Sequence, residues 1–320
     1  MSSVVPVTVM SYNIQGLSNV AYPIANLAVR MQSIISFLVT IVEKYAVDVL
    51  ILQEVFTIGL YQGLKLALSS IMSYDTGIRI KATNAIDTWQ HLLSICVPSL
   101  KLTPGGVIIF SKHEIREKKR FLYNTSILPD LVASKGVVLA RIMINGRLLD
   151  VLGTHVQSHE GKAAEKVRTQ QMTEVADWIG NKRGDYVLSE SERIPAKDIP
   201  VVLAGDFNSC VIRDAEATQT LFRALENVCK PIFGDKEPEA TYSTITNDFC
   251  RHQNKDEYDH VYDYILVGPN VEVQLPQTVV RDVLEEGIFV YKRFLRFFRN
   301  GTQEVRNVSD HYPVYATIGI

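Results

Sequence analysis

Residues 200–209 read Pro200-Val201-Val202-Leu203-Ala204-Gly205-Asp206-Phe207-Asn208-Ser209. A short apolar run bounded by proline and by polar residues is typical of a buried strand. Asp206 and Asn208 are two residues apart, so they lie on the same side of an extended chain, and a hard cation prefers their oxygen atoms. Ligands gather where strands end in sheet-based enzymes, and this stretch therefore predicts a coordination site. A turn or a helix N-cap after the strand would use the same residue types, which this stretch alone does not separate from a site.

The composition bounds the class of protein. The chain has 320 residues, of which 47% are hydrophobic and 21% charged, enough for one large globular domain or two small ones. Its formal net charge is -2, so no global positive field attracts nucleic acid, and a polyanion has to be bound by a local patch. The four cysteines lie far apart without C-x-x-C spacing, which favours neither a zinc site nor a dense disulfide framework.

The N-terminal region predicts a strand and a helix instead of a targeting segment. Val4 to Met10 leads directly into Ser11-Tyr12-Asn13, so we expect a first strand and no signal peptide. The apolar stretch from Ile24 to Val42 is interrupted by polar residues, which suits a helix packed on a sheet and not a membrane span. The location stays open; we expect a secreted or membrane-peripheral protein if a signal peptide was removed.

Several predicted strands end in a polar side chain. The strand over 5–13 ends at Asn13, and the strand over 48–55 carries Glu54. Residues 135–155 predict a hairpin, because Asn145-Gly146 between apolar runs is typical of a type I′ turn, and His155 then ends the second strand. Further elements are expected as helices over 24–45, 60–71, 162–180 and 215–229, a polar loop over 183–197, and strands over 107–112, near 263–267 and from Ser309. This order predicts an α/β fold of two packed sheets, mixed or antiparallel, with helices outside. No repeat or composition break marks a boundary, so we expect one domain over residues 1–320.

Taken together, the motifs resemble a known superfamily. They are Ser-Tyr-Asn13, Leu-Gln-Glu54-Val, Gly-Thr-His155, Gly-Asp206-Phe-Asn208, Tyr-Asp263-Tyr-Ile and Ser-Asp310-His311-Tyr-Pro-Val. In this order they resemble the endonuclease/exonuclease/phosphatase superfamily from end to end. The resemblance implies a four-layered α/β sandwich with Mg²⁺ at one edge, with Mn²⁺ or Co²⁺ able to substitute, and cleavage of a P–O bond by in-line attack of water.

Within that superfamily the chain is most similar to neutral sphingomyelinases of the bacterial sphingomyelinase C type. The stretches that carry this similarity are Gly105-Gly106 with Ser111-Lys112, Ser134-Lys135-Gly136-Val137, His155-Val-Gln157, and Ser309 to Pro313. The similarity implies hydrolysis of sphingomyelin to ceramide and phosphocholine by a monomer in peripheral contact with a membrane, without nucleic acid. Residues 114–129 contain no cysteine, where secreted relatives often have a disulfide.

Each candidate residue has a chemical reason for its assignment. We place the metal ligands at Asn13, Glu54, Asp206, Asn208 and Asp310, because a phosphodiester and its transition state need a counter-charge. His311 is the expected general base, since an ordinary pKa of about 6.5 leaves it neutral at physiological pH. Neighbouring strand residues point to opposite faces, so Asp263, and not Asp310, is the expected partner of His311. The remaining catalytic candidates are Asp206, Asn208, Lys135 and His155, which would stabilise the transition state or the leaving oxygen if the anionic setting protonates it.

Two alternatives remain. One is a nuclease or inositol-phosphate phosphatase on the same scaffold; the other is an inactive module that binds membranes, although Glu54, Asp206 and His311 are all present. We give no site role to His159, Glu160, His252, Asp259 and His260.

The segment over 287–299 mixes aromatic and basic residues. A core element with a basic edge is one interpretation. Similarity to bacterial sphingomyelinases implies instead an aromatic-tipped β-hairpin here, and Asn300-Gly301 is a turn signal. Because aromatic and basic side chains settle at lipid interfaces, we expect Phe294, Phe297 and Phe298 to include the membrane contacts.

Overall fold

The computed structural model describes residues 4–17, 26–78, 105–130, 133–189, 191–234, 237–295 and 298–320. One six-stranded sheet has the order β15-β18-β1-β2-β4-β3. Its strands are β1 (Pro6–Asn13), β2 (Val49–Gln53), β3 (Tyr74–Asp75), β4 (Ile108–Ser111), β15 (Glu272–Val279) and β18 (Val314–Gly319). β1 and β2 are parallel and the other pairs antiparallel. The C-terminal strand thus pairs with the N-terminal one.

The second six-stranded sheet has the order β11-β14-β10-β7-β6-β5. Its strands are β5 (Glu114–Leu122), β6 (Gly136–Ile144), β7 (Arg147–His155), β10 (Val201–Asp206), β11 (Lys230–Pro231) and β14 (Asp263–Val267). β7 and β10 are parallel, and the other pairs are antiparallel. β6 and β7 form the predicted hairpin, with Asn145 and Gly146 both at positive φ, 48° and 81°.

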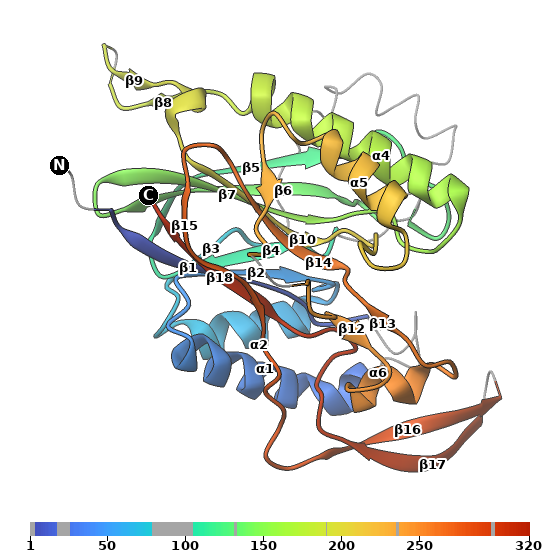
Figure 1. Ribbon diagram of the computed structural model, residues 1–320. Coiled ribbons are helices and arrows are strands. Elements are labelled where there is room, and N and C mark those ends of the chain that lie inside the picture. The colour runs from blue at the N-terminus through green and yellow to red at the C-terminus, as the bar shows by residue number, and fades with distance from the viewer. Residues whose placement is uncertain are drawn as a thin grey trace, which may run out of the picture.

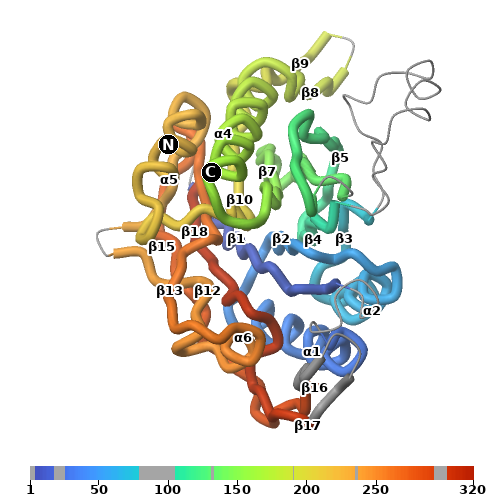
Figure 2. Tube along the Cα trace, turned by 90° about the vertical axis from the view of Figure 1, so that its right-hand side faces the viewer, coloured from blue at the N-terminus to red at the C-terminus, as the bar shows by residue number. Residues whose placement is uncertain are grey.

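Helices cover the outer face of each sheet, so the predicted four layers are confirmed (Figure 1). α1 (Leu27–Lys44) and α2 (Ile58–Leu68) pack on the first sheet; α4 (Lys162–Asp177), continued by a π turn over Trp178–Lys182, and α5 (Ala215–Arg223) pack on the second. Between the sheets lies a layer of mostly aliphatic side chains, including Val9 and Ile51 from one sheet and Val151 and Val202 from the other. The rotated view in Figure 2 separates the two helical layers on either side of the sheets.

Small elements occupy the connections. They are β8 (Tyr186–Val187), β9 (Arg193–Ile194), a 3-10 turn (Ala196–Asp198), β12 (Tyr242–Ser243), α6 (Asp248–Gln253) and β13 (Asp259–His260). The polar loop expected over 183–197 therefore contains a short two-stranded pairing. None of the helices in the described ranges is both long and apolar enough to cross a membrane.

Two predicted boundaries were wrong. The last strand begins at Val314 instead of Ser309, because Pro313 lacks an N–H and the N–H of Tyr312 bonds to the carbonyl of Thr241, outside the sheet. Helix α5 ends at Arg223, after which bonds such as Leu225 N–H to Phe222 C=O tighten the chain into turns.

β16 (Ile288–Leu295) and β17 (Phe298–Val305) form the expected hairpin, but its turn lies elsewhere. Leu295 pairs with Phe298, so the chain reverses before Asn300-Gly301, and the predicted turn at Asn300-Gly301 was wrong. Gly301 has a φ of 77° beside a shift in register, which is the geometry of a β-bulge. The same positive φ that suits Asn-Gly for a turn suits glycine for a bulge, so the sequence signal was ambiguous.

Candidate active site

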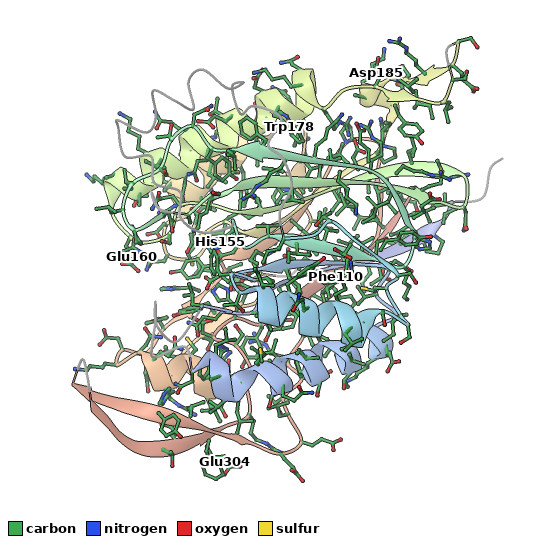
Figure 3. The ribbon with its side chains drawn as sticks, turned by 180° about the vertical axis from the view of Figure 1, so that it is seen from behind. Phe110, His155, Glu160, Trp178, Asp185 and Glu304 are labelled. Carbon is green, nitrogen blue, oxygen red and sulfur yellow. The ribbon has the colours of Figure 1, made fainter. Side chains whose placement is uncertain are left out.

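The register of the strands, parallel and antiparallel, brings the candidate residues to one end of the sandwich. In the second sheet Asp206 is in register with His155 on β7 and with Asp263 on β14. In the first sheet Asn13 is in register with Gln53, and Glu54 follows directly. Figure 3 shows His155 at this end, with Glu160 beyond it, whereas Asp185 lies toward the opposite end.

Asn13 joins the two sheets. Its side-chain N–H groups donate to Glu54 Oε1 at 3.1 Å and to Asp206 Oδ2 at 3.0 Å. Its Oδ1 accepts the backbone N–H of Gln15 at 3.0 Å. Because its oxygen is used inside the protein, Asn13 here orients the two carboxylates and does not present its oxygen between them.

His311 lies against Asp263 and beside Asp206. Its Nδ1 is 2.8 Å from Asp263 Oδ2, and its Nε2 is 3.8 Å from Asp206 Oδ2. Asp263 is therefore the partner of His311, as expected, although strand alternation is not the reason, because Asp310 and His311 both precede β18. The ring of Tyr242 meets the imidazole edge-on at a centroid distance of 4.9 Å and limits its rotation.

The charge state of His311 differs from the one expected from its ordinary pKa. Burial alone would lower the pKa of His311, but the charge of Asp263, its hydrogen bond, and the charges of Asp206 and Asp310 raise that pKa to about 10. With these carboxylates not neutralised by any other charge, His311 is protonated at neutral pH. His311 can therefore act as a general base only when additional positive charge offsets the negative charge of these carboxylates and lowers its pKa.

His155 has the opposite character. Lys135 Nζ lies 3.1 Å from His155 Nε2, donates to the carbonyl of Val156, and pairs with Asp130 at 2.9 Å. Burial, then the charges of Lys135 and His311, hold the pKa of His155 well below its usual value. The condition for a cationic role of His155 is therefore not met: its burial, and the buried Lys135 facing the nitrogen nearest Asp206, keep the ring neutral.

Glu54, Asp310 and Asn208 complete the group. Burial and the nearby charge of Asp310 raise the pKa of Glu54 to about 7. Asp310 accepts hydrogen bonds from Gln15 Nε2 at 2.6 Å and from Ser309 Oγ at 3.2 Å, and burial raises its pKa as well. Asn208 donates its backbone N–H to Asp206 Oδ1 at 2.8 Å, and its side chain reaches the carbonyl of Val156 at 3.4 Å.

Strained backbone accompanies these strand ends. Gln15, Glu54 and Asn208 follow β1, β2 and β10 at φ values of 45°, 62° and 47°. Left-handed backbone is costly for side chains other than glycine and is often kept at functional sites. Here it turns the chain sharply where each strand reaches the site.

The donor set fits a hard divalent cation. Among the described residues, the buried Glu54 Oε2 and Asp263 Oδ1 have no hydrogen-bond partner. Asp206, Asp263 and His311 offer ligand atoms within 4.8 Å of one another. Unpartnered carboxylate oxygens at a buried position favour a cation, and Mg²⁺ is the ion that combines few carboxylates with retained water.

All of the predicted metal and catalytic residues thus lie at one end of the sandwich, joined by direct contacts or through one shared neighbour. Of the predicted membrane residues, Phe294 is on β16 and Phe298 is on β17, which are not among the strands that carry the site, and Phe297 falls outside the described residues. Gln15, Asp130 and Tyr242 contact the site but were missed from sequence. Only the position of Gln15, two residues after Asn13 at a strand end, could have indicated one of them.

Comparison with known proteins gives consistent matches. A family model described as the Endonuclease/Exonuclease/phosphatase family matches residues 10–311. Sphingomyelinase C from Bacillus cereus is 28% identical over 295 residues, covering 85% of this chain and 78% of that protein. Two crystal structures share the fold. A mutant beta toxin from Staphylococcus aureus with bound magnesium ions has a TM-score of 0.73 at 24% identity, covering 98% of this chain and 99% of its own. Sphingomyelinase C from Streptomyces griseocarneus has a TM-score of 0.70 at 22% identity, with the same coverage.

Proposed function

The chain belongs to the endonuclease/exonuclease/phosphatase family and is a phosphodiesterase of that family, and on this premise we propose that it hydrolyses sphingomyelin to ceramide and phosphocholine with Mg²⁺. The observation that carries the proposal is the convergence of Glu54 and Asp206, bridged by Asn13, with the hydrogen-bonded Asp263–His311 pair. We extend the proposal to one catalytic domain over residues 1–320, acting as a monomer.

In the proposed reaction Glu54, Asp206 and Asp310, with Asn208, would hold Mg²⁺, and Asn13 would fix the two carboxylates that it bridges. When bound, Mg²⁺ supplies positive charge that offsets the carboxylates and polarises the phosphoryl oxygens. With that charge offset, His311 is free to lose its proton at Nε2 and to accept one from the attacking water, while Asp263 holds Nδ1. The Lys135 ammonium would add positive charge beside the phosphoryl group. Because that ammonium donates to His155 Nε2, the proton of the neutral His155 ring is on Nδ1, which has no hydrogen-bond partner among the described residues and would be its donor.

The lipid substrate is supported by two observations. Curated relatives carry the names sphingomyelinase C and phospholipase C, which describe enzymes of lipid phosphodiesters. The β16–β17 hairpin projects from the layer of α1 and α6, toward the side of the molecule where β12 and β13 lie (Figure 1). Peripheral contact through this hairpin would bring the site to a membrane surface, and the net charge of -2 favours no nucleic-acid substrate.

A side-by-side assay tests the proposal. Purified protein is given sphingomyelin, phosphatidylcholine, a phosphoinositide and DNA with an abasic site, each in Mg²⁺, in EDTA, and in EDTA followed by excess Mg²⁺. We expect the highest kcat/KM on sphingomyelin, loss of turnover in EDTA, and recovery on adding Mg²⁺. Preferred cleavage of the DNA or the phosphoinositide would replace the lipid assignment, and full turnover in EDTA would exclude the metal.

A further inference from the structure

The side chains of Gln15 and Gln253 form a hydrogen-bonded pair next to the candidate active site. Gln15 Nε2 donates to Gln253 Oε1 at 2.8 Å, and Gln253 Nε2 donates to Gln15 Oε1 at 2.8 Å. Gln15 Nε2 also donates to Asp310 Oδ2 at 2.6 Å. Every polar atom of the Gln15 amide is therefore used, and only 6% of Gln15 is exposed.

This arrangement selects one orientation of the Gln15 amide. A flipped amide would place its oxygen against the Asp310 carboxylate and would lose the donor that Asp310 accepts. The reciprocal bonds to Gln253 oppose that flip, because both amides would have to turn together. Asp310 is thus held at Oδ2 by Gln15 and at Oδ1 by Ser309.

The backbone of Gln15 is fixed as well. Its N–H donates to Asn13 Oδ1, and its carbonyl accepts from the buried Arg30 side chain at 2.6 Å. Arg30 also donates to the carbonyl of Val308 at 2.5 Å. A single residue just after β1 therefore contacts both Asp310, a proposed metal ligand, and Asn13, which orients the Glu54 and Asp206 carboxylates.

Gln253 comes from α6, whose other residues contact the β16–β17 hairpin. Phe249 packs with Val290 and Val305, and His252 lies 3.3 Å from the carbonyl of Tyr291. α6 therefore has contacts both with the site and with the hairpin, which gives the amide of Gln253 a fixed support.

From these contacts we propose that Gln15 and Gln253 are positioning residues, which act as one unit to set the geometry of Asn13 and Asp310 for a divalent cation. The inference rests on the proposed function for the role of those two residues. Partners that orient metal ligands typically change metal affinity or activity by about 10- to 100-fold. Neither glutamine needs to touch the cation or the substrate.

The test measures Mg²⁺ affinity by calorimetry without substrate, alongside the thermal unfolding midpoint. The variants are Gln15→Met, Gln253→Met and the double variant, because methionine keeps the side-chain length and adds no cavity. Gln274→Met, an exposed glutamine on β15, is the matched control. We expect each single variant to remain folded at the assay temperature and to bind Mg²⁺ about 10- to 100-fold more weakly, and the double variant to match the weaker single one.

Three outcomes would overturn the inference. Gln253→Met with wild-type Mg²⁺ affinity would show that the pair does not set the ligand geometry. Single effects that multiply in the double variant would show that the two residues act independently. If Gln15→Met does not fold, Gln253→Met decides alone. Wild-type protein that binds no Mg²⁺ would overturn the metal role of Asp310 along with the inference, whereas an unaffected variant of a Mg²⁺-binding protein overturns the inference only.

Discussion

Four titratable side chains at the site hold protons more tightly than they do in water: Glu54, Asp263, Asp310 and His311. For a group whose pKa is raised by folding, the folded state keeps a proton that the unfolded state releases. Its contribution to stability is present below the unfolded pKa and is lost as the pH rises through the folded pKa. For His311 this window runs from about 6.5 in the unfolded chain to about 10. Folding thus brings carboxylates together at the site without enough positive charge to neutralise them.

We therefore expect metal-free protein to lose stability between pH 7 and pH 9. Each proton kept only by the folded state contributes about 1.4 kcal/mol per pH unit to the free energy of unfolding. His155 adds nothing in this range, because its lowered pKa leaves it neutral in both states. Urea unfolding in EDTA at pH 7, 8 and 9 measures the slope. His311→Gln should flatten this slope, and His113→Gln, in the half-buried turn between β4 and β5, should not. A wild-type stability that rises with pH would contradict the protonated His311.

Replacing His311 by alanine should lower kcat by at least about 10²-fold, because general-base assistance is typically worth roughly 10² to 10⁴. Circular dichroism checks that the fold is intact, and kcat is measured on sphingomyelin at saturating Mg²⁺. His113→Ala removes a histidine that pairs with Asp48, away from the candidate active site, and should keep normal turnover. Near-normal kcat in His311→Ala would assign the proton to another group.

At the residue scale, the sequence predicts which residues form the candidate active site better than it predicts their protonation states. Asp263, and not Asp310, pairs with His311 as expected, but the argument from strand alternation was wrong, because Asp310 and His311 both precede β18. The protonation of His155 and His311 could not be predicted, because it depends on which buried charges surround each ring. Gln15 and Gln253 are 238 positions apart, and no local pattern links two glutamines.

At the scale of elements, the β16–β17 hairpin shows where sequence signals become ambiguous. Its strands were expected, but Asn300-Gly301 forms a bulge and not the turn, since positive φ serves both. The hairpin is anchored at its base: Asn26 Oδ1 accepts the N–H of Tyr291 at 3.1 Å, and Val290 and Val305 are buried against Phe249. Such an anchored base leaves the outer end of the hairpin as the part available for another surface.

Replacing Phe294, Phe297 and Phe298 together by serine should weaken binding to sphingomyelin vesicles and lower vesicle turnover, while sparing hydrolysis of a small soluble phosphodiester. Aromatic side chains gain free energy at a lipid interface that a soluble substrate does not require. Vesicle co-sedimentation and the two turnover rates are the measurements. Leu66→Ser, at a leucine 79% exposed on α2, is the control for loss of an exposed apolar side chain. Equal loss of turnover on both substrates, or an unfolded protein, would indicate that these residues stabilise the fold and are not membrane contacts.

For the whole molecule, the layers could be predicted from sequence but the contact between sheets could not. Apolar strands with polar ends predict two packed sheets, because the apolar faces of the strands must be buried between layers. They also predict that the polar residues at the strand ends gather at one edge of the sandwich. The distance between the sheets is set by side chains that meet from distant segments. Gly153 on β7 shows this: a Cβ there would lie 2.7 Å from Cγ2 of Ile51, on β2 of the opposite sheet, and 2.8 Å from Cγ1 of Val107, just before β4. Glycine at this position lets the sheets approach each other two residues before His155.

Gly153→Ala should therefore lower the free energy of unfolding by about 1–3 kcal/mol, the usual cost of extra volume in a packed core. Because β7 carries His155 and β2 leads into Glu54, separating the sheets here should also reduce kcat/KM. Urea unfolding and turnover on sphingomyelin measure the two effects. Gly59→Ala on α2 is the matched control, since no heavy atom lies within 4 Å of its added Cβ, and alanine there should raise stability by about 0.5–1 kcal/mol with unchanged turnover. If Gly153→Ala is as stable and active as the wild type, the sheets can adjust at this point, and their spacing does not set the geometry that joins Glu54 to Asp206 through Asn13.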